Sequence, residues 1–197
     1  MDITTKDRIL NMALTMFAEN GYKGTNLRDL AAALGLSKSA LYKHYESKEA
    51  IWNALLDKMI AYYEQRFGSP EHLPPIPSSV EELLALTMRM IRFTVYDPQI
   101  ILTRKLLLTE QFHDPRACRM ATKYFMESNA GIYTRVFAGM MDAGLLPREE
   151  PRMMAFAYTA PISTLVHLCD RIPDRREEVL QQIESFSRYF FTSRHVL

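Results

Sequence analysis

Little in this 197-residue chain points to secretion, a membrane or a disulfide framework. It has two cysteines, Cys118 and Cys169, far apart in predicted helices, so buried reduced thiols are expected and a disulfide is not. No apolar run approaches about 18 residues, the length that spans a bilayer, and no basic-then-apolar leader is present. We therefore expect a cytoplasmic protein without a membrane segment.

An excess of charge of one sign is also missing. Lys and Arg number 24 against 23 Asp and Glu, which gives a net charge of +1. This balance excludes a basic tail or a bulk nucleic-acid coat. A local basic cluster is still enough to bind phosphates, and the candidates for one are Lys23, Arg28, Lys38, Lys43 and Lys48.

The motifs of common enzymes and metal sites are absent as well. The sequence has no H-E-x-x-H, no G-x-S-x-G, no P-loop and no paired-cysteine metal signature. Glu110, His113 and Asp114 are close enough in sequence to suggest acid, base or ligand roles. Asp114, however, has a plainer role as the cap of a helix that begins at Pro115. We expect no catalytic residue, no metal site and no cofactor.

What the sequence does contain is helical periodicity, without a competing strand pattern. After the N-terminal segment and a proline-rich linker over 68–79, helices are predicted over 79–96, 98–112, 115–143, 148–169 (kinked at Pro161) and 174–192. The predicted fold class is all-α with about nine helices. We divide it into residues 1–65 and 66–197.

Residues 27–46 hold a short helix, a glycine turn and a second short helix, the arrangement of a helix-turn-helix. Asn26 and Asp29 are spaced as in a capping box. Gly35 suits a turn that needs positive φ, and Ser37 is placed to cap the second helix. That helix offers hydroxyl, amine, phenol and imidazole groups, which suit phosphate oxygens and base edges. The segment therefore predicts DNA binding.

A denser signal comes from the spacing of positions in the first 60 or so residues. They are Thr5, Ile9, Ala13, Phe17, Gly21, Tyr22, Thr25, Leu30, Ala31, Gly35, Leu36, Ser37, Leu41, Tyr42, His44, Ser47, Lys48 and Glu49. In this register the chain resembles the TetR family of bacterial transcriptional regulators. Tyr45 stands where phenylalanine is usual and Ser39 where glycine is common, and both changes are conservative. The resemblance implies a three-helix DNA-binding domain followed by a larger helical domain that binds an effector and dimerises.

The resemblance also implies which residues contact DNA. Thr25, Tyr42 and Lys48 would hold phosphates, with His44 assisting. Asn26 is a further candidate for DNA contact, and Arg28, two residues on, would reach a phosphate or a base edge. Base contacts are expected from Ser37, Lys38, Ser39, Ala40 and Lys43, because lysine suits guanine O6 and N7 and alanine suits the thymine methyl.

Methionine and aromatic residues are dense between positions 88 and 168, which suits an adaptable apolar cavity. Together with the resemblance, they predict a small, largely hydrophobic effector. The expected lining is Tyr63, Phe67, Met90, Phe93, Tyr96, Phe112, Tyr124, Phe125, Tyr133, Phe137 and Tyr158. For each residue, an ordinary place in the core is the alternative.

Two apolar stripes in the last two helices suit a dimer interface, which the family typically builds there. They are Met154, Pro161, Thr164, Leu165 and Leu168, and then Val179, Ile183, Phe186 and Phe190. The alternative is that both stripes belong to the chain's own core. A homodimer would place two recognition helices about 34 Å apart on an inverted repeat.

The resemblance leaves more than one role open. We expect a repressor that blocks polymerase at a palindromic operator and is released by its effector. Activators, and proteins that bind DNA to position or inhibit the division machinery, share the fold. A bundle with a purely structural role would lack the DNA function altogether.

Overall fold

The structure, a computed structural model, describes residues 3–67 and 75–194. Over those ranges it is helical and contains no strand, as predicted. The chain divides into two compact units: Met1–Ser69 with Leu102–Ala121, and Pro70–Ile101 with Thr122–Leu197. The first unit therefore contains residues 102–121 in addition to the N-terminal segment expected from the sequence.

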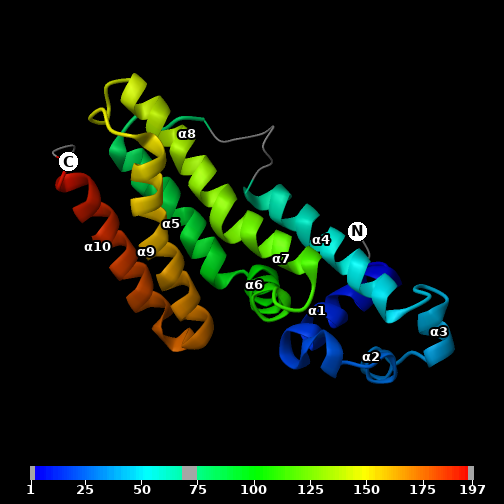
Figure 1. The fold of residues 1–197 in the computed structure, drawn as a ribbon. Helices are drawn as coiled ribbons and strands as arrows, with labels where there is room; N and C mark the ends of the chain where they lie inside the picture. The colour runs from blue at the N-terminus through cyan, green and yellow to red at the C-terminus, as the bar shows by residue number, and fades with distance from the viewer. Residues whose placement is uncertain (1–2, 68–74, 195–197) are drawn as a thin grey trace. The chain divides into compact units, whose positions relative to one another are not determined.

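The first unit contains α1 (Thr5–Gly24), α2 (Leu27–Ala33), α3 (Lys38–Tyr42), α4 (Lys48–Phe67), the end of α6 (Pro98–Glu110) and α7 (Pro115–Thr122). Figure 1 shows α1 to α4 in blue to cyan. One apolar face of each helix is buried, and together these faces form a small core: Ile9, Ala13, Phe17, Leu30, Leu41, Ile51, Leu55 and Met59. This core holds α2 and α3 against α1 and α4.

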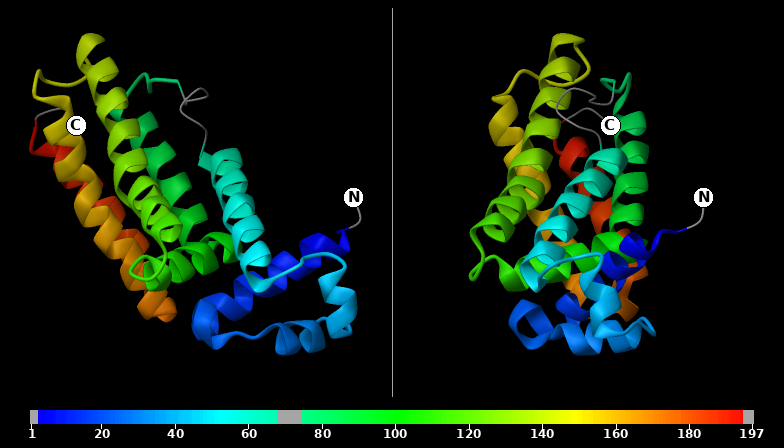
Figure 2. Two further views of the ribbon diagram at one scale, coloured as in Figure 1. Left: turned by 45° about the vertical axis from the view of Figure 1, so that its right-hand side comes forward. Right: turned by 90° about the vertical axis from the view of Figure 1, so that its right-hand side faces the viewer.

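The second unit contains α5 (Val80–Tyr96), the π-helical turn η1 (Lys123–Glu127), α8 (Ser128–Asp142), α9 (Pro151–Arg171), the 3-10 turn η2 (Pro173–Arg175) and α10 (Arg176–Thr192). Figures 1 and 2 show α5, α8, α9 and α10 side by side as a bundle. Its core includes Leu83, Phe137, Tyr158, Ile183 and Phe191, which are fully or almost fully buried.

Several helix boundaries differ from the predicted ones. Helix α9 begins at Pro151 and not near residue 148, because the Glu150 carboxylate accepts the backbone N–H groups of Arg152 and Met153. Helix α6 ends at Glu110, and the long helix predicted over 115–143 contains the π-helical turn. Most of the predicted linker, residues 68–74, lies outside the described residues.

Neither cysteine is in a disulfide, and Cys169 is buried as expected. Cys118 is exposed on α7, so the expectation that both thiols are buried is wrong for that residue. Among the described helices, none has the length and apolar character needed to cross a membrane.

Candidate nucleic-acid interface

The caps predicted for the helix-turn-helix are all formed. Asn26 accepts the backbone N–H of Asp29 at 2.9 Å, and its amide donates to the Asp29 carboxylate. Ser37 accepts the backbone N–H of Ala40 at 3.1 Å. Gly35 lies between the two helices with a φ of 68°, a conformation that glycine adopts without steric cost. The turn therefore holds α2 and α3 at a fixed angle.

The outer face of α3 is polar and open. Ser37, Lys38, Ser39, Tyr42 and Lys43 are exposed there. The Lys38 ammonium lies 5.7 Å from the centre of the Tyr42 ring, and the hydroxyl oxygens of Ser37 and Ser39 are 3.0 Å apart. An exposed surface of hydroxyls and amines on a helix of this kind can contact phosphates and base edges in the major groove.

The remaining predicted contacts of this helix, Ala40 and His44, are half-buried, and Arg28 projects from the exposed face of α2. Thr25 is turned inward. It is 3% exposed, and its hydroxyl lies within hydrogen-bonding distance of the Met16 and Gly21 carbonyl oxygens, so its visible role is to close the end of α1. A phosphate contact by its side chain remains a prediction.

Lys48, at the start of α4, is held by an aromatic cluster. Its ammonium lies 4.4 Å from the centre of the Tyr22 ring, and the Tyr22 ring packs against Trp52 and Phe17. Burial lowers the pKa of Lys48, and the negative charge of Glu110 opposes that shift. The side chain is only half-buried, so its ammonium can still reach a phosphate while the ring fixes its position.

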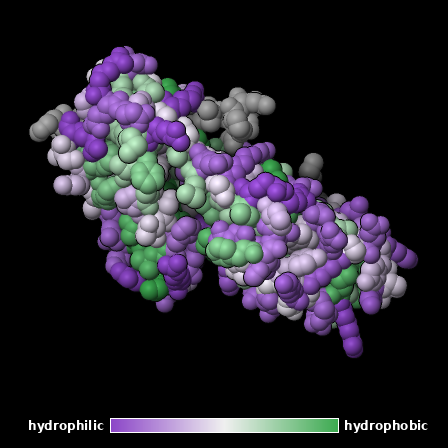
Figure 3. Space-filling model, viewed as in Figure 1, coloured by the Kyte–Doolittle hydropathy of each residue, from purple (hydrophilic) through white to green (hydrophobic). Residues whose placement is uncertain are grey.

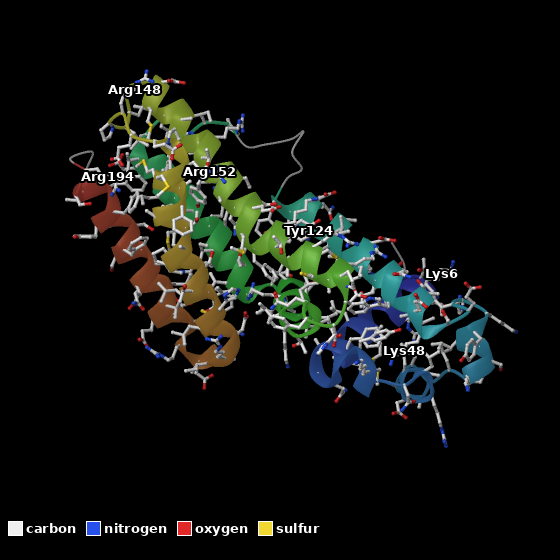
Figure 4. The ribbon with its side chains drawn as sticks, viewed as in Figure 1. Lys6, Lys48, Tyr124, Arg148, Arg152 and Arg194 are labelled. Atoms are coloured by element: carbon white, nitrogen blue, oxygen red, sulfur yellow. The ribbon has the colours of Figure 1, made fainter. Side chains whose placement is uncertain are left out.

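A basic residue that the sequence reasoning missed lies at the start of α1. The Lys6 ammonium is 5.9 Å from the centre of the Tyr45 ring, at the end of the helix-turn-helix segment. Figure 4 labels Lys6 and Lys48, which come from two different helices of the same unit. No local motif marks Lys6, because an exposed lysine near a helix start is common on any surface.

The acid and base candidates considered from the sequence have structural roles. Asp114 accepts the backbone N–H groups of Arg116 and Ala117, as a helix cap does, and also the indole N–H of Trp52 at 3.2 Å. Glu110 accepts the backbone N–H of Tyr22 at 2.9 Å. Over the part of the chain that the structure describes, no group of three metal-ligating side chains comes together.

The residues expected to line an effector cavity are divided between the two units. Tyr63, Phe67 and Phe112 belong to the first unit, and the Phe112 ring is 81% exposed. In the second unit, Met90, Phe93 and Phe125 are partly buried and Tyr124 is buried.

Four of the predicted lining residues have identified partners in the second unit. The hydroxyl of Tyr96 donates to Glu177 at 2.6 Å on the surface. Tyr133, Phe137 and Tyr158 pack their rings together, with centroids 5.2 to 5.7 Å apart. For these three residues the structure shows a packed core, and an effector contact by any of the predicted lining residues remains a prediction.

The stripes expected to pair two protomers are also divided. Met154, Val179, Ile183 and Phe190 pack inside the second unit, whereas Leu165, Leu168 and Phe186 are partly buried and Pro161 and Thr164 are exposed. Large apolar side chains that the sequence reasoning missed are more exposed: Met153 at 63%, Phe156 at 61% and Tyr189 at 71%. Figure 3 shows apolar side chains gathered over α9 on this face.

Comparison with known proteins points to DNA-binding regulators, the class of protein that the helix-turn-helix also indicates. Residues 9–55 match the model of the family described as bacterial regulatory proteins, tetR family. This match confirms the resemblance that the sequence predicted for the N-terminal segment, and the proteins that the family's description names are regulatory ones.

Two staphylococcal repressors are similar over the same segment. The negative transcriptional regulator IcaR of the biofilm operon is 38% identical over 58 residues in Staphylococcus epidermidis, which is 29% of this chain and 31% of that protein. In Staphylococcus aureus the identity is 45% over 47 residues, 24% of this chain and 25% of IcaR. The match thus spans less than a third of the length of these relatives.

Solved structures resemble the whole chain. A tetR-family regulator from Mesorhizobium loti covers 95% of both chains with a TM-score of 0.67 and 17% identity. AibR, solved with isovaleryl coenzyme A and operator DNA, covers 92% of this chain and 96% of its own, with a TM-score of 0.62 and 22% identity. SmeT, repressor of a multidrug efflux pump of Stenotrophomonas maltophilia, covers 93% and 86%, with a TM-score of 0.61 and 20% identity. At these identities the likeness establishes the fold.

Proposed function

We propose that this protein is a homodimeric repressor that binds an inverted-repeat operator in the bacterial cytoplasm and is released by a small, largely hydrophobic effector. The observation that carries the proposal is the exposed polar face of α3, from Ser37 to Lys43, on a helix-turn-helix whose caps and turn are formed. Such a face has no packing role within the chain, and it has the side chains that read a major groove.

Phosphate binding would come from cations on several helices. Arg28 and Lys43 are exposed, Lys48 is held over a tyrosine ring, and Lys6 adds a charge at the start of α1. With a net charge of only +1, the chain gains its affinity from this local cluster and not from a general positive field.

Dimerisation is supported by the exposed apolar residues of α9 and α10. Met153, Phe156 and Pro161 are exposed on α9, and Tyr189 is exposed on α10. Patches of this kind on a soluble surface mark protein interfaces. One recognition helix reads few base pairs, so a second copy is needed for useful specificity.

The test of dimerisation is the mass of the protein in solution, from light scattering after gel filtration. We expect a dimer for the wild-type chain and a monomer for Phe156→Glu. Phe112→Glu is the matched control, because it places the same charge on another exposed phenylalanine, in the first unit, and should leave the dimer intact. If both variants are dimers, the interface does not include this face of α9.

The proposed effector is supported by relatives that bind small molecules: AibR with isovaleryl coenzyme A, and SmeT with triclosan. In this chain the effector would bind in the second unit and lower DNA affinity. Coupling of about 1–3 kcal/mol is typical of such systems, which corresponds to a change of roughly 5- to 150-fold.

The experiment that tests the function is the selection of genomic fragments by the purified protein at near-physiological salt. We expect one inverted repeat to be enriched, and a Tyr42→Ala, Lys43→Ala variant to lose it. Genes beside the repeat then nominate effectors, which should release the DNA. Many scattered sites without a response to small molecules would instead favour a role in positioning cell-division machinery.

A further inference from the structure

One buried carboxylate lies behind the DNA-binding helices and takes no direct part in the proposed contacts. Glu110, the last residue of α6, is only 5% exposed. Its Oε1 accepts the backbone N–H of Tyr22 at 2.9 Å, across 88 residues of sequence. A hydrogen bond to a charged acceptor is among the stronger ones in proteins, and a carboxylate is costly to bury unless it is bonded in this way.

The Tyr22 N–H belongs to the turn that joins α1 to α2. Gly21 has a φ of 74° and a ψ of 162°, which interrupts α1, and Thr25 closes the turn with its hydroxyl near the Gly21 carbonyl oxygen. A Cβ at Gly21 would come within 3.3 Å of the Glu110 carboxylate, so the backbone and the carboxylate fit closely. The turn leads directly into the cap Asn26 and the start of α2.

Tyr22 also connects Glu110 with a predicted phosphate ligand. The Lys48 ammonium lies over the ring of Tyr22, whose backbone Glu110 holds. A second carboxylate, Asp114, fixes the neighbouring Trp52 ring through its indole N–H. Glu110 thus bonds the backbone of Tyr22 and Asp114 the indole of Trp52, two of the three aromatic residues in the cluster that supports Lys48.

We propose that Glu110 is a positioning residue for DNA binding. Its carboxylate fixes the turn from Gly21 to Thr25 and, through Tyr22, the ammonium of Lys48, and so sets the affinity for backbone phosphates without touching DNA. This inference rests on the DNA-binding part of the proposed function and is independent of any effector, operator or dimer interface.

The test compares Glu110→Ala with Glu110→Gln on a duplex of random sequence, well below the unfolding temperature of each variant. Glutamine keeps an acceptor for the Tyr22 N–H, whereas alanine leaves this donor without its partner. We expect binding by the alanine variant to be about tenfold weaker, and binding by the glutamine variant to stay within about threefold of wild type. For the alanine variant, the slope of the logarithm of the binding constant against that of the salt concentration should become shallower by about the value of one phosphate contact, because Lys48 is no longer held in place.

Asp57→Asn is the matched control for charge. It removes one carboxylate from the same unit, at an exposed position that pairs with Arg116 and does not contact Tyr22. We expect it to leave both the affinity and the salt slope unchanged. Equal affinities for the alanine and glutamine variants, or an alanine variant within twofold of wild type, would overturn the proposal.

A measurement without DNA separates this proposal from the proposed function. Hydrogen exchange of the Tyr22 amide should accelerate in Glu110→Ala and stay slow in Glu110→Gln, while exchange in α8 and α9 is unchanged. Unaltered Tyr22 exchange in the alanine variant would refute the positioning role even if the chain represses a gene. Failure of the wild-type chain to bind any duplex, with slow exchange at Tyr22, would remove the DNA-binding function itself and with it the role of Glu110 in it.

Discussion

The hydroxyl of Tyr158 donates to the Oγ of Ser187 at 3.0 Å, and both residues are completely buried. This bond joins α9 to α10 inside the aromatic core of the second unit. We predict that Tyr158→Phe lowers the free energy of unfolding by about 1–2 kcal/mol, because the Ser187 hydroxyl keeps its burial and loses its partner. Urea denaturation measures the change.

A double-mutant cycle with Ser187→Ala supplies the control. Removing both groups leaves no unpaired hydroxyl, so the double variant should cost less than the sum of the two single variants. Additive losses would mean that the two hydroxyls contribute nothing as a pair.

Burial also makes the second unit sensitive to alkali. Burial raises the pKa of Tyr158 and that of Tyr133, whose hydroxyl lies 2.8 Å from Thr87. Above pH about 10 the unfolded tyrosines lose their protons while the folded ones keep them, so stability falls as pH rises. Chemical denaturation between pH 8 and about 11 should show this loss, and the Tyr133→Phe, Tyr158→Phe variant should show a flatter profile. Equal slopes for the two proteins would rule these residues out.

Two glycines with positive φ should respond differently to alanine. Gly35 has open space where a Cβ would lie, so Gly35→Ala should cost about 1 kcal/mol, from backbone conformation alone. Gly21 combines its φ of 74° with a ψ of 162°, a region almost exclusive to glycine, and its Cβ would crowd Glu110. We expect Gly21→Ala to cost about 2–3 kcal/mol in thermal or urea unfolding. Equal costs would mean that neither the ψ of Gly21 nor the contact with Glu110 adds to the cost of a positive φ.

Variants on the exposed face of α3 should distinguish residues that contact phosphates from residues that contact bases. Tyr42→Phe removes one hydroxyl and should weaken binding to all DNA sequences about equally. Lys43→Ala should change the preference among sequences by roughly 1–3 kcal/mol if its amine reads a base. Binding measured on a panel of operator variants distinguishes the two. A uniform loss for Lys43→Ala, with a smaller salt dependence, would make Lys43 a phosphate contact.

The elements that local chemistry controls could be predicted from the sequence. The caps at Asn26, Ser37 and Asp114 were all predicted, because a cap acts on backbone groups two to four residues away. Apolar periodicity likewise predicted the helices, and the spacing of the first segment predicted the resemblance that the family model matches over residues 9–55.

Contacts between distant residues could not be predicted in this way. The bonds from Glu110 to Tyr22 and from Arg116 to Asn53 and Asp57 join positions about 60 to 90 apart, and no local pattern encodes them. They join residues 102–121 to the N-terminal helices within the first unit.

The apolar residues predicted to form a dimer interface on α9 could not be assigned from sequence periodicity for a different reason. Helix α9 is apolar on two faces: Met154, Ile162 and Val166 are buried, while Met153 and Phe156 are exposed. Periodicity detects both faces but does not say which one packs within the chain. The positions of α5, α8 and α10, which pack against α9, decide it.

The chain's one tryptophan, Trp52, is buried against Phe17 and Tyr22 and bonded to Asp114. The intrinsic fluorescence excited at the red edge of protein absorption therefore comes entirely from the unit that carries the DNA-binding helices. Far-UV circular dichroism, by contrast, sums the helices of both units. Following the two signals through one denaturation would show whether the DNA-binding unit unfolds before, after or together with the second unit. The measurement needs no label and uses the wild-type protein.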